Sequence, residues 1–275
     1  MSLKLAISNI AWPADIRHEV YGFLSRNGVT GVEVAPTKIA PWDDLNKAVL
    51  TAERDLMATF GLTVSSYQAL YFGLPGLALL EDEPAFEALL KHTVRVARMA
   101  EQLSQGGGGV FGAPRNRLRG RLSEAEAFEL GAERFAKLAK AVSSYGFTIM
   151  LEPAPPEYGG DFLRTERDCA AMVQCVAHPA FRLHVDTGCL TIAGEDGAEI
   201  VAKYHNLIGH IHLSQPSLAP VEMSAMPTFA CLLRSLREAA YSGWTAIEMR
   251  ESDLPMQAVE VAIRTVHAAL PGSSN

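Results

Sequence analysis

Short apolar runs rich in β-branched residues alternate with longer amphipathic segments along the whole chain. An apolar run bounded by turn residues predicts a strand, and apolar residues recurring every three or four positions predict a helix. The clearest helices are predicted over 83–104 and over 123–144, where Ser123 and Glu126 form a capping-box pattern. The predicted strands are 4–10, 31–36, 62–69, 108–114, 148–154, 182–188, 208–214 and 245–251.

The strands and helices follow one another at a nearly even pace. Dividing the 275 residues by eight gives strand-plus-helix units of about 34 residues, which matches a closed (β/α)8 TIM barrel better than an open sheet. Without an internal linker or charge run, we expect one TIM-barrel domain over 1–275, with 271–275 as a loose tail. The glycine run 106–109 precedes a strand, so it predicts a flexible helix-to-strand turn and not a phosphate-binding loop.

Composition narrows the range of partners. A formal net charge of −7 argues against nucleic acid, which requires a basic face. The four cysteines show no CxxC pairing, which fits a reducing cytoplasm. No run of about 18 apolar residues exists, so we expect no membrane span.

Each of the last four predicted strands ends in a group able to bind a metal: Glu152, Asp186, His212 and Glu248. In a barrel, the carboxyl ends of neighbouring strands converge on one mouth. Three carboxylates and an imidazole gathered there would repel one another and lose hydration unless a cation compensates them. We therefore predict one bound divalent ion, with Mn²⁺, Mg²⁺ or Co²⁺ suited to oxygen-rich ligation and Zn²⁺ also compatible.

Three further polar residues are predicted to face the barrel interior. His184 and His210 precede Asp186 and His212 by two positions, so each points to the same face one layer deeper. We interpret both as outer supports of the metal ligands and not as ligands. For Glu33, an ion pair with a deep partner and a contact to substrate both remain open.

Several motifs together resemble a known family. LEPAPPEYG, VDTG, HIHLSQP and AIEM, in this order, resemble the xylose isomerase-like TIM barrels of the sugar phosphate isomerase/epimerase group. That group includes the ketose 3-epimerases and, more distantly, endonuclease IV. GVEVAPTK, SSYQALYFGLP and VFGAPRNR extend the resemblance over most of the chain.

The resemblance implies a metal-dependent isomerase or epimerase acting on a small sugar or related polyhydroxy carbonyl compound. By motif position, the single metal would be held by Glu152, Asp186, His212 and Glu248. Glu152 and Glu248 would also be catalytic, moving a proton between opposite faces of the sugar through a metal-stabilised enediolate. The resemblance leaves homo-oligomerisation open.

The chain departs from the epimerase pattern at substrate-contacting positions. Cys189 stands where the pattern has histidine, and Leu218 stands where it has arginine. The family's glutamate beyond the first ligand is displaced, which leaves Glu157 or Tyr158 as a polar contact. These differences imply an altered substrate. For Cys189 itself, a small packed side chain is favoured over a metal ligand or reactive thiol.

Other loop residues are candidates for substrate binding. Arg115 lies in the arginine-rich loop 112–121 after the fourth predicted strand, where it could meet a phosphate or carboxylate on the substrate. A solvated arginine loop is an equal alternative. Trp12 and Tyr67 follow the first and third strands and are candidates for an apolar wall against a sugar ring.

Three other functions are compatible with the same scaffold to different degrees. A sugar or inosose dehydratase could use the same metal site and expel a hydroxyl. A DNA-repair endonuclease is disfavoured, because the predicted third and fourth strands end without histidines and the chain is acidic. A non-catalytic sugar-binding barrel is opposed by the intact glutamate pair and favoured by Cys189 and Leu218.

Overall fold

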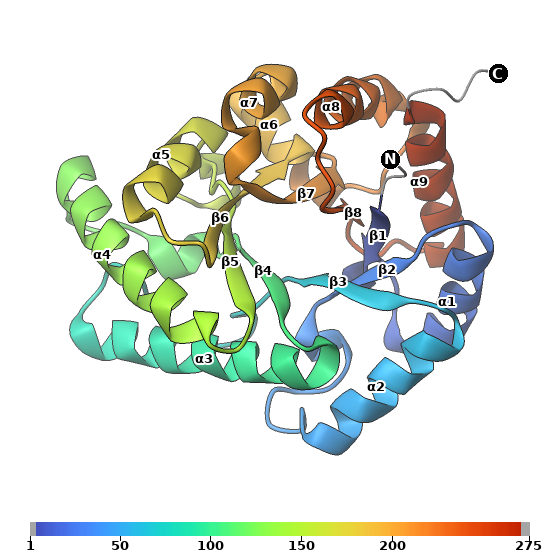
Figure 1. Ribbon diagram of the computed structural model, residues 1–275, viewed down its shortest axis with the longest axis horizontal. Coiled ribbons are helices and arrows are strands. Elements are labelled where there is room, and N and C mark those ends of the chain that lie inside the picture. Colours follow the sequence, from blue (N-terminus) through green and yellow to red (C-terminus); the bar gives the residue numbers. More distant parts are fainter. Residues whose placement is uncertain (1–3, 271–275) are drawn as a thin grey trace.

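Eight parallel strands close into a barrel in the order of the sequence (Figure 1). The computed structural model describes residues 4–270, so the expected loose tail at 271–275 lies outside the described residues. The pairing of the last strand with the first closes the ring. The strands are β1 Lys4–Ser8, β2 Gly31–Val34, β3 Thr63–Tyr67, β4 Gly107–Phe111, β5 Phe147–Leu151, β6 Phe181–Asp186, β7 Ile208–Ser214 and β8 Trp244–Glu248. The predicted (β/α)8 TIM barrel is confirmed.

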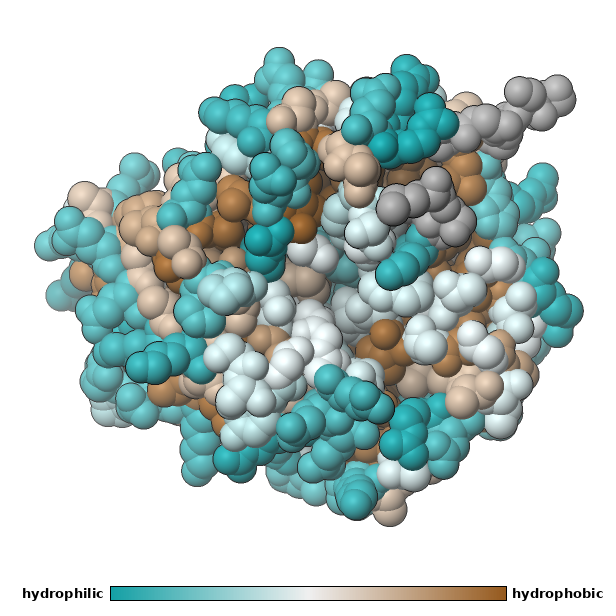
Figure 2. Space-filling model, viewed as in Figure 1, coloured by the Kyte–Doolittle hydropathy of each residue, from teal (hydrophilic) through white to brown (hydrophobic). Residues whose placement is uncertain are grey.

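The helices form an outer ring around the strands (Figure 1). They are α1 Arg17–Arg26, α2 Lys47–Thr59, α3 Glu83–Ser104, α4 Glu124–Ser143, α5 Glu166–Val176, α6 Thr187–Ala193, α7 Gly197–Tyr204, α8 Met226–Glu238 and α9 Pro255–Ala269. Each buries an apolar stripe against the barrel; in α3 this stripe includes Phe86, Leu89, Val96 and Leu103. Hydrophilic residues accordingly dominate the outer rim of the molecule (Figure 2). Within residues 4–270, no helix combines the length and apolarity needed to cross a membrane.

The predicted helix bounds agree closely with the structure, whereas most predicted strands run too far. The helix predicted over 83–104 is confirmed, and Ser123 and Glu126 make the predicted capping box at the start of α4. The strand predicted over 4–10 ends at Ser8, and that over 245–251 ends at Glu248. Apolar residues continue into the loops beyond the strand ends, so side-chain type does not show where the hydrogen-bonded ladder stops.

The glycine run 106–109 serves close packing, and the prediction of a flexible turn is wrong for its last three residues. Gly107, Gly108 and Gly109 are the first residues of β4. A Cβ at Gly106 would lie 2.4 Å from the carbonyl oxygen of Gly146, and one at Gly109 would lie 2.4 Å from the ring of Phe147. Only glycine leaves room for these approaches.

Candidate metal centre and cavity

Three carboxylates surround one ring nitrogen of His212 at the carboxyl end of the barrel. His212 Nδ1 lies 3.2 Å from Glu248 Oε2, 3.6 Å from Glu152 Oε1 and 3.8 Å from Asp186 Oδ2. Strand pairing explains the arrangement, because Asp186 pairs with His212 across β6 and β7, and Ser214 pairs with Glu248 across β7 and β8. The structure thus brings the four predicted ligands together around a single atom.

The opposite side of the His212 ring is held by a buried carboxylate. His212 Nε2 lies 2.8 Å from Glu33 Oε2, so the nitrogen that carries the hydrogen faces Glu33. In the neutral imidazole, Nδ1 is then an acceptor, and it is buried without a hydrogen-bond partner. A lone pair that faces three carboxylates is repelled by all of them. A divalent cation would turn this repulsion into ligation, so these residues fit a metal ion.

Without a cation, the negative charge of the carboxylates can instead be balanced by a second proton on the His212 ring. Burial by itself would lower the pKa of His212, but the charges of Glu33 and Glu248 outweigh it and raise the pKa well above its usual range. A proton and a metal ion therefore compete for the same nitrogen.

Glu33 is the centre of a fully buried polar network beneath the mouth. Its carboxylate accepts hydrogen bonds from Ser66 Oγ at 2.8 Å and Gln68 Nε2 at 3.0 Å, and it lies 3.1 Å from His210 Nε2. Burial alone would raise the pKa of Glu33, but His212 and His210 outweigh it and hold the pKa well below its usual range. Of the two roles left open for Glu33, the deep ion pair is the one observed.

Asp186 is held in place on both oxygens. Its Oδ1 accepts from the backbone N–H of Cys189 at 2.6 Å, which also caps α6, and its Oδ2 accepts from Ser214 Oγ at 2.5 Å. Its own backbone N–H donates to Glu166 Oε1 at 3.0 Å. Burial raises the pKa of Glu166 well above its usual range, which favours the neutral form of this side chain. Glu166 was missed in the sequence because it begins a helix and not the loop after a strand.

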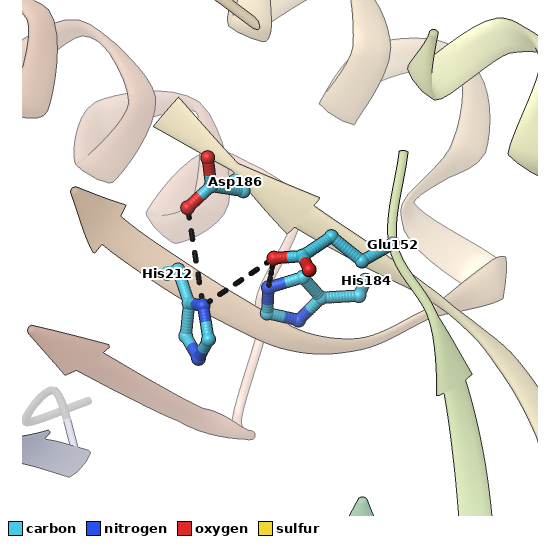
Figure 3. A group of neighbouring side chains, drawn as sticks. All are labelled: Glu152, His184, Asp186 and His212. Carbon is cyan, nitrogen blue, oxygen red and sulfur yellow. Dashed lines mark ion pairs between the residues drawn. The ribbon is translucent and has the colours of Figure 1, made fainter. Parts of the chain in front are cut away.

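His184 joins the cluster more closely than the sequence suggested. One donor atom each from Glu152, His184, Asp186 and His212 lie within 4.8 Å of one another (Figure 3). His184 Nε2 is 3.4 Å from Glu152 Oε1. A second group of this kind consists of Glu33, His210 and His212. The described residues therefore offer glutamate, aspartate and histidine groups that could hold a metal ion.

The two glutamates differ in their affinity for protons. Burial alone would raise the pKa of Glu152, but contacts with His184 and His212 lower it to about 2. Burial raises the pKa of Glu248 to about 7, with His212 opposing the shift only in part. These directions favour a charged Glu152 and a partly protonated Glu248 at neutral pH.

A cavity of about 1010 Å³ opens next to these two glutamates. Its walls are the loops that follow β3 and β4, and both Glu152 and Glu248 line it. Gly112 in the second loop makes room for the first glutamate, because a Cβ there would lie 2.1 Å from Glu152 Oε2. The other lining residues are mainly apolar, with Gln68, Glu81, Arg115 and Asn116 as the polar ones.

Of the predicted substrate-binding residues, only Arg115 is among the residues that line this cavity. Arg115 is exposed and lines it. Tyr158 is half-buried, its hydroxyl accepts from the backbone N–H of Ser217 at 2.9 Å, and Glu157 beside it is exposed. Cys189 is buried, and burial raises its thiol pKa well above the usual range, so its sulfur is protonated.

Trp12 and Tyr67 belong to the hydrophobic core and not to the cavity lining described by the structure. Trp12 packs edge-on against Tyr21 of α1, with ring centroids 6.3 Å apart. The Tyr67 hydroxyl lies 2.5 Å from Ser104 Oγ at the end of α3. The cause is strand alternation: Ser66 faces the interior, so Tyr67 faces the outer helices.

The aromatic wall that the structure does provide comes from Tyr71 and Phe72, in the loop after β3. Sequence reasoning missed both residues, together with Gln68. The stretch SSYQALYFGLP contained the signal, because an aromatic pair and glycines directly follow a strand in a barrel.

Comparisons with known proteins agree with this architecture. A family model described as "Xylose isomerase-like TIM barrel" matches residues 22–267. No curated protein sequence matches the chain.

Solved structures with the same fold include several sugar epimerases. A D-psicose 3-epimerase structure determined in the presence of D-fructose has a TM-score of 0.78 at 17% identity and covers 96% of this chain and 97% of its own. The D-psicose 3-epimerase of Clostridium cellulolyticum H10 with D-tagatose has a TM-score of 0.76 at 14% identity, covering 97% and 96%. A 3-keto-D-glucoside 4-epimerase from E. coli has a TM-score of 0.75 at 17% identity, covering 98% and 99%.

Proposed function

Because the chain belongs to the xylose isomerase-like TIM barrel family, we propose that it is a divalent-metal-dependent isomerase or epimerase of a small sugar or related polyhydroxy carbonyl compound. One observation carries this proposal: Glu152 and Glu248 both line the cavity and both flank the Nδ1 atom of His212. Glu152 directly follows β5 and Glu248 ends β8, and in this proposal a substrate seated between them meets one carboxyl group on each side.

The residues have separate tasks in this proposal. Asp186 and His212 hold the ion together with the two glutamates, and a bound divalent cation would act as a Lewis acid toward a carbonyl group. One of the two glutamates would remove a proton from the carbon beside the carbonyl. The other would return a proton on the opposite face of the same carbon. Mn²⁺, Mg²⁺ and Co²⁺ suit the oxygen-rich ligand set, and Zn²⁺ is compatible with it.

The cavity supports a substrate with a polar end and a less polar remainder. Gln68 and the two glutamates occupy its deep end, and Tyr71 and Phe72 belong to its apolar wall. We propose Arg115, Glu157, Tyr158 and Cys189 as further substrate contacts. The epimerase structures described above act on sugars according to their names, which supports a sugar-like substrate. All four cysteines are free, which supports a reducing compartment such as the cytoplasm.

The test is solvent deuterium exchange. The protein is incubated in deuterated water with a panel of ketoses and keto acids, before and after removal of metal by a chelator. The expected result is deuterium at the carbon next to a carbonyl, lost with the metal and restored by Mn²⁺ or Co²⁺. A product lighter by one water would instead identify a dehydratase. Binding of a sugar without any exchange at carbon would contradict the proposal and favour a non-catalytic binding barrel.

A further inference from the structure

Two histidines at the same depth of the barrel differ in their hydrogen-bond partners. His184 on β6 and His210 on β7 are direct partners in the strand pairing, and each is buried. His210 Nε2 is satisfied by Glu33 and by Ser66 Oγ at 3.1 Å. Both ring nitrogens of His184, in contrast, are buried without a hydrogen-bond partner. A buried imidazole with neither nitrogen satisfied is costly unless another group binds it.

The position of His184 shows what that group would be. Its Nε2 is 3.4 Å from Glu152 Oε1, and its ring lies edge-on to that of His212 with centroids 4.1 Å apart. The His184 donor atom lies within 4.8 Å of those of Glu152, Asp186 and His212 (Figure 3). Donors on one ion with bonds of about 2.1 Å lie at most about 4.2 Å apart, so small side-chain movements suffice to close this group around a metal.

We propose that His184 is an additional ligand of the metal centre, not an outer support like His210. This inference rests on the metal site of the proposed function, to which it adds a second imidazole. Glu248 lies 3.2 Å from His212 Nδ1 and lines the cavity, whereas His184 is fully buried and is not among the lining residues.

A second imidazole changes which ions the site prefers. Oxygen-only or nearly oxygen-only sites suit Mg²⁺ and Ca²⁺, whereas imidazole nitrogen favours Co²⁺, Cu²⁺ and Zn²⁺. The site is therefore expected to select these transition ions over Mg²⁺. His184 is the residue that sets this preference.

Pulsed electron paramagnetic resonance of the full chain loaded with Cu²⁺ tests the ligand directly. Two coordinated imidazoles are expected in the unchanged protein, one from His212 and one from His184. The variant His184→Leu should show one. A single imidazole in the unchanged protein overturns the proposal. His210 is not expected to supply the second imidazole, because its Nε2 is bound to Glu33.

Metal affinities separate ligation from mere positioning of Glu152. Outer supports of metal ligands change affinity by about 10- to 100-fold, so loss of a ligand in His184→Leu is expected to lower Zn²⁺ affinity more than about 100-fold. The variant His184→Gln keeps an N–H donor for Glu152 but no imidazole, and it should lose as much. Mg²⁺ affinity should change less than about tenfold in either variant.

The control is His92→Gln, which removes a buried histidine on α3 that bonds the carbonyl of Leu70 at 2.8 Å. Zn²⁺ affinity should be unchanged there, and thermal unfolding shows whether each variant is folded. Retention of Zn²⁺ affinity by folded His184→Gln would overturn the proposal. If resonance detects one imidazole and deuterium exchange is intact, only the His184 assignment is refuted. If resonance detects two imidazoles and no exchange occurs, only the proposed function is refuted.

Discussion

The two halves of the barrel contribute different chemistry to its mouth. The strand ends of the second half, β5 to β8, carry the four side chains that we propose as metal ligands, Glu152, Asp186, His212 and Glu248. The first half supplies Glu33, Ser66 and Gln68, which form a buried hydrogen-bond network behind His212. The loops of β3 and β4 add the walls of the cavity.

The comparison shows that glutamate side chains can have different roles in one barrel, and that their contacts decide the role. Both oxygens of Glu33 are engaged by His210, His212, Ser66 and Gln68. Glu152 and Glu248 keep oxygens directed toward Nδ1 of His212 and the cavity. One half orients the imidazole, and the other half supplies the carboxylates that we propose bind the metal and move protons.

The strongest test of the second half is removal of one cavity-lining carboxylate. Glu152→Gln and Glu248→Gln should each slow exchange at the substrate carbon by about 10²- to 10⁴-fold, the contribution typical of a general acid or base. Exchange rates are measured by mass spectrometry, with circular dichroism as the check of the fold.

The matched control for this pair is Glu251→Gln, three residues beyond Glu248. Glu251 is exposed and bonds Lys38 at 3.1 Å. Its variant should exchange at the rate of the unchanged protein. Full activity in either Glu152→Gln or Glu248→Gln would contradict the catalytic role proposed for that glutamate.

The first half is tested by Glu33→Gln. Without the buried carboxylate, the hydrogen on Nε2 of His212 is no longer favoured, and Nδ1 becomes a poorer ligand. Metal affinity should fall by about 10- to 100-fold, as for other outer-shell partners of metal-bound histidines, and isothermal titration calorimetry measures it.

Glu53→Gln is the control for the loss of a buried carboxylate. Glu53 is buried and accepts from the Tyr21 hydroxyl at 2.6 Å, and the structure does not place it among the groups that could hold a metal. Its variant should lose stability but keep its metal affinity. Equal loss of metal affinity in both variants would mean that Glu33 acts only through stability.

Metal affinity should depend on pH through Glu248. Its pKa is raised to about 7, so it gains a proton as the pH falls through 7, and this proton must leave before the oxygen can bind a cation. Glu248 should therefore add a decrease in affinity of about tenfold for each pH unit below 7 to the decrease caused by the proton on His212. The dependence should be weaker in Glu248→Gln; an affinity that is flat between pH 5 and pH 7 in the unchanged protein would contradict this role.

The smallest effect is expected at Arg115 on the cavity rim. Exposed charge pairs contribute about 0–1 kcal/mol, so Arg115→Gln should raise KM less than about fivefold for substrates that carry a phosphate or carboxylate. KM for neutral sugars should not change. Arg121→Gln, an exposed arginine of the same loop outside the cavity lining, is the control. An equal effect of both variants would mean that only the overall charge of the loop matters.

The sequence by itself determined the barrel and the polar groups at its strand ends. Even spacing of strands and helices, the capping box at Ser123, and acidic or imidazole side chains at the ends of the last four strands are local patterns that need no knowledge of distant contacts. Strand alternation was likewise sufficient to place His184, His210 and Glu33 inside the barrel.

The tertiary structure decided which of these groups acquire partners. His184 and His210 look equivalent in the sequence, yet only His210 finds Glu33, because β2 brings that carboxylate toward β7 and not toward β6. Tyr67 lies on β3 and faces outward toward Ser104. Tyr71 lies in the long loop after β3, and the path of that loop places it in the lining of the cavity. Hydrogen bonding and burial at this mouth depend on atoms far apart in the chain, and that is why only the folded barrel specifies them.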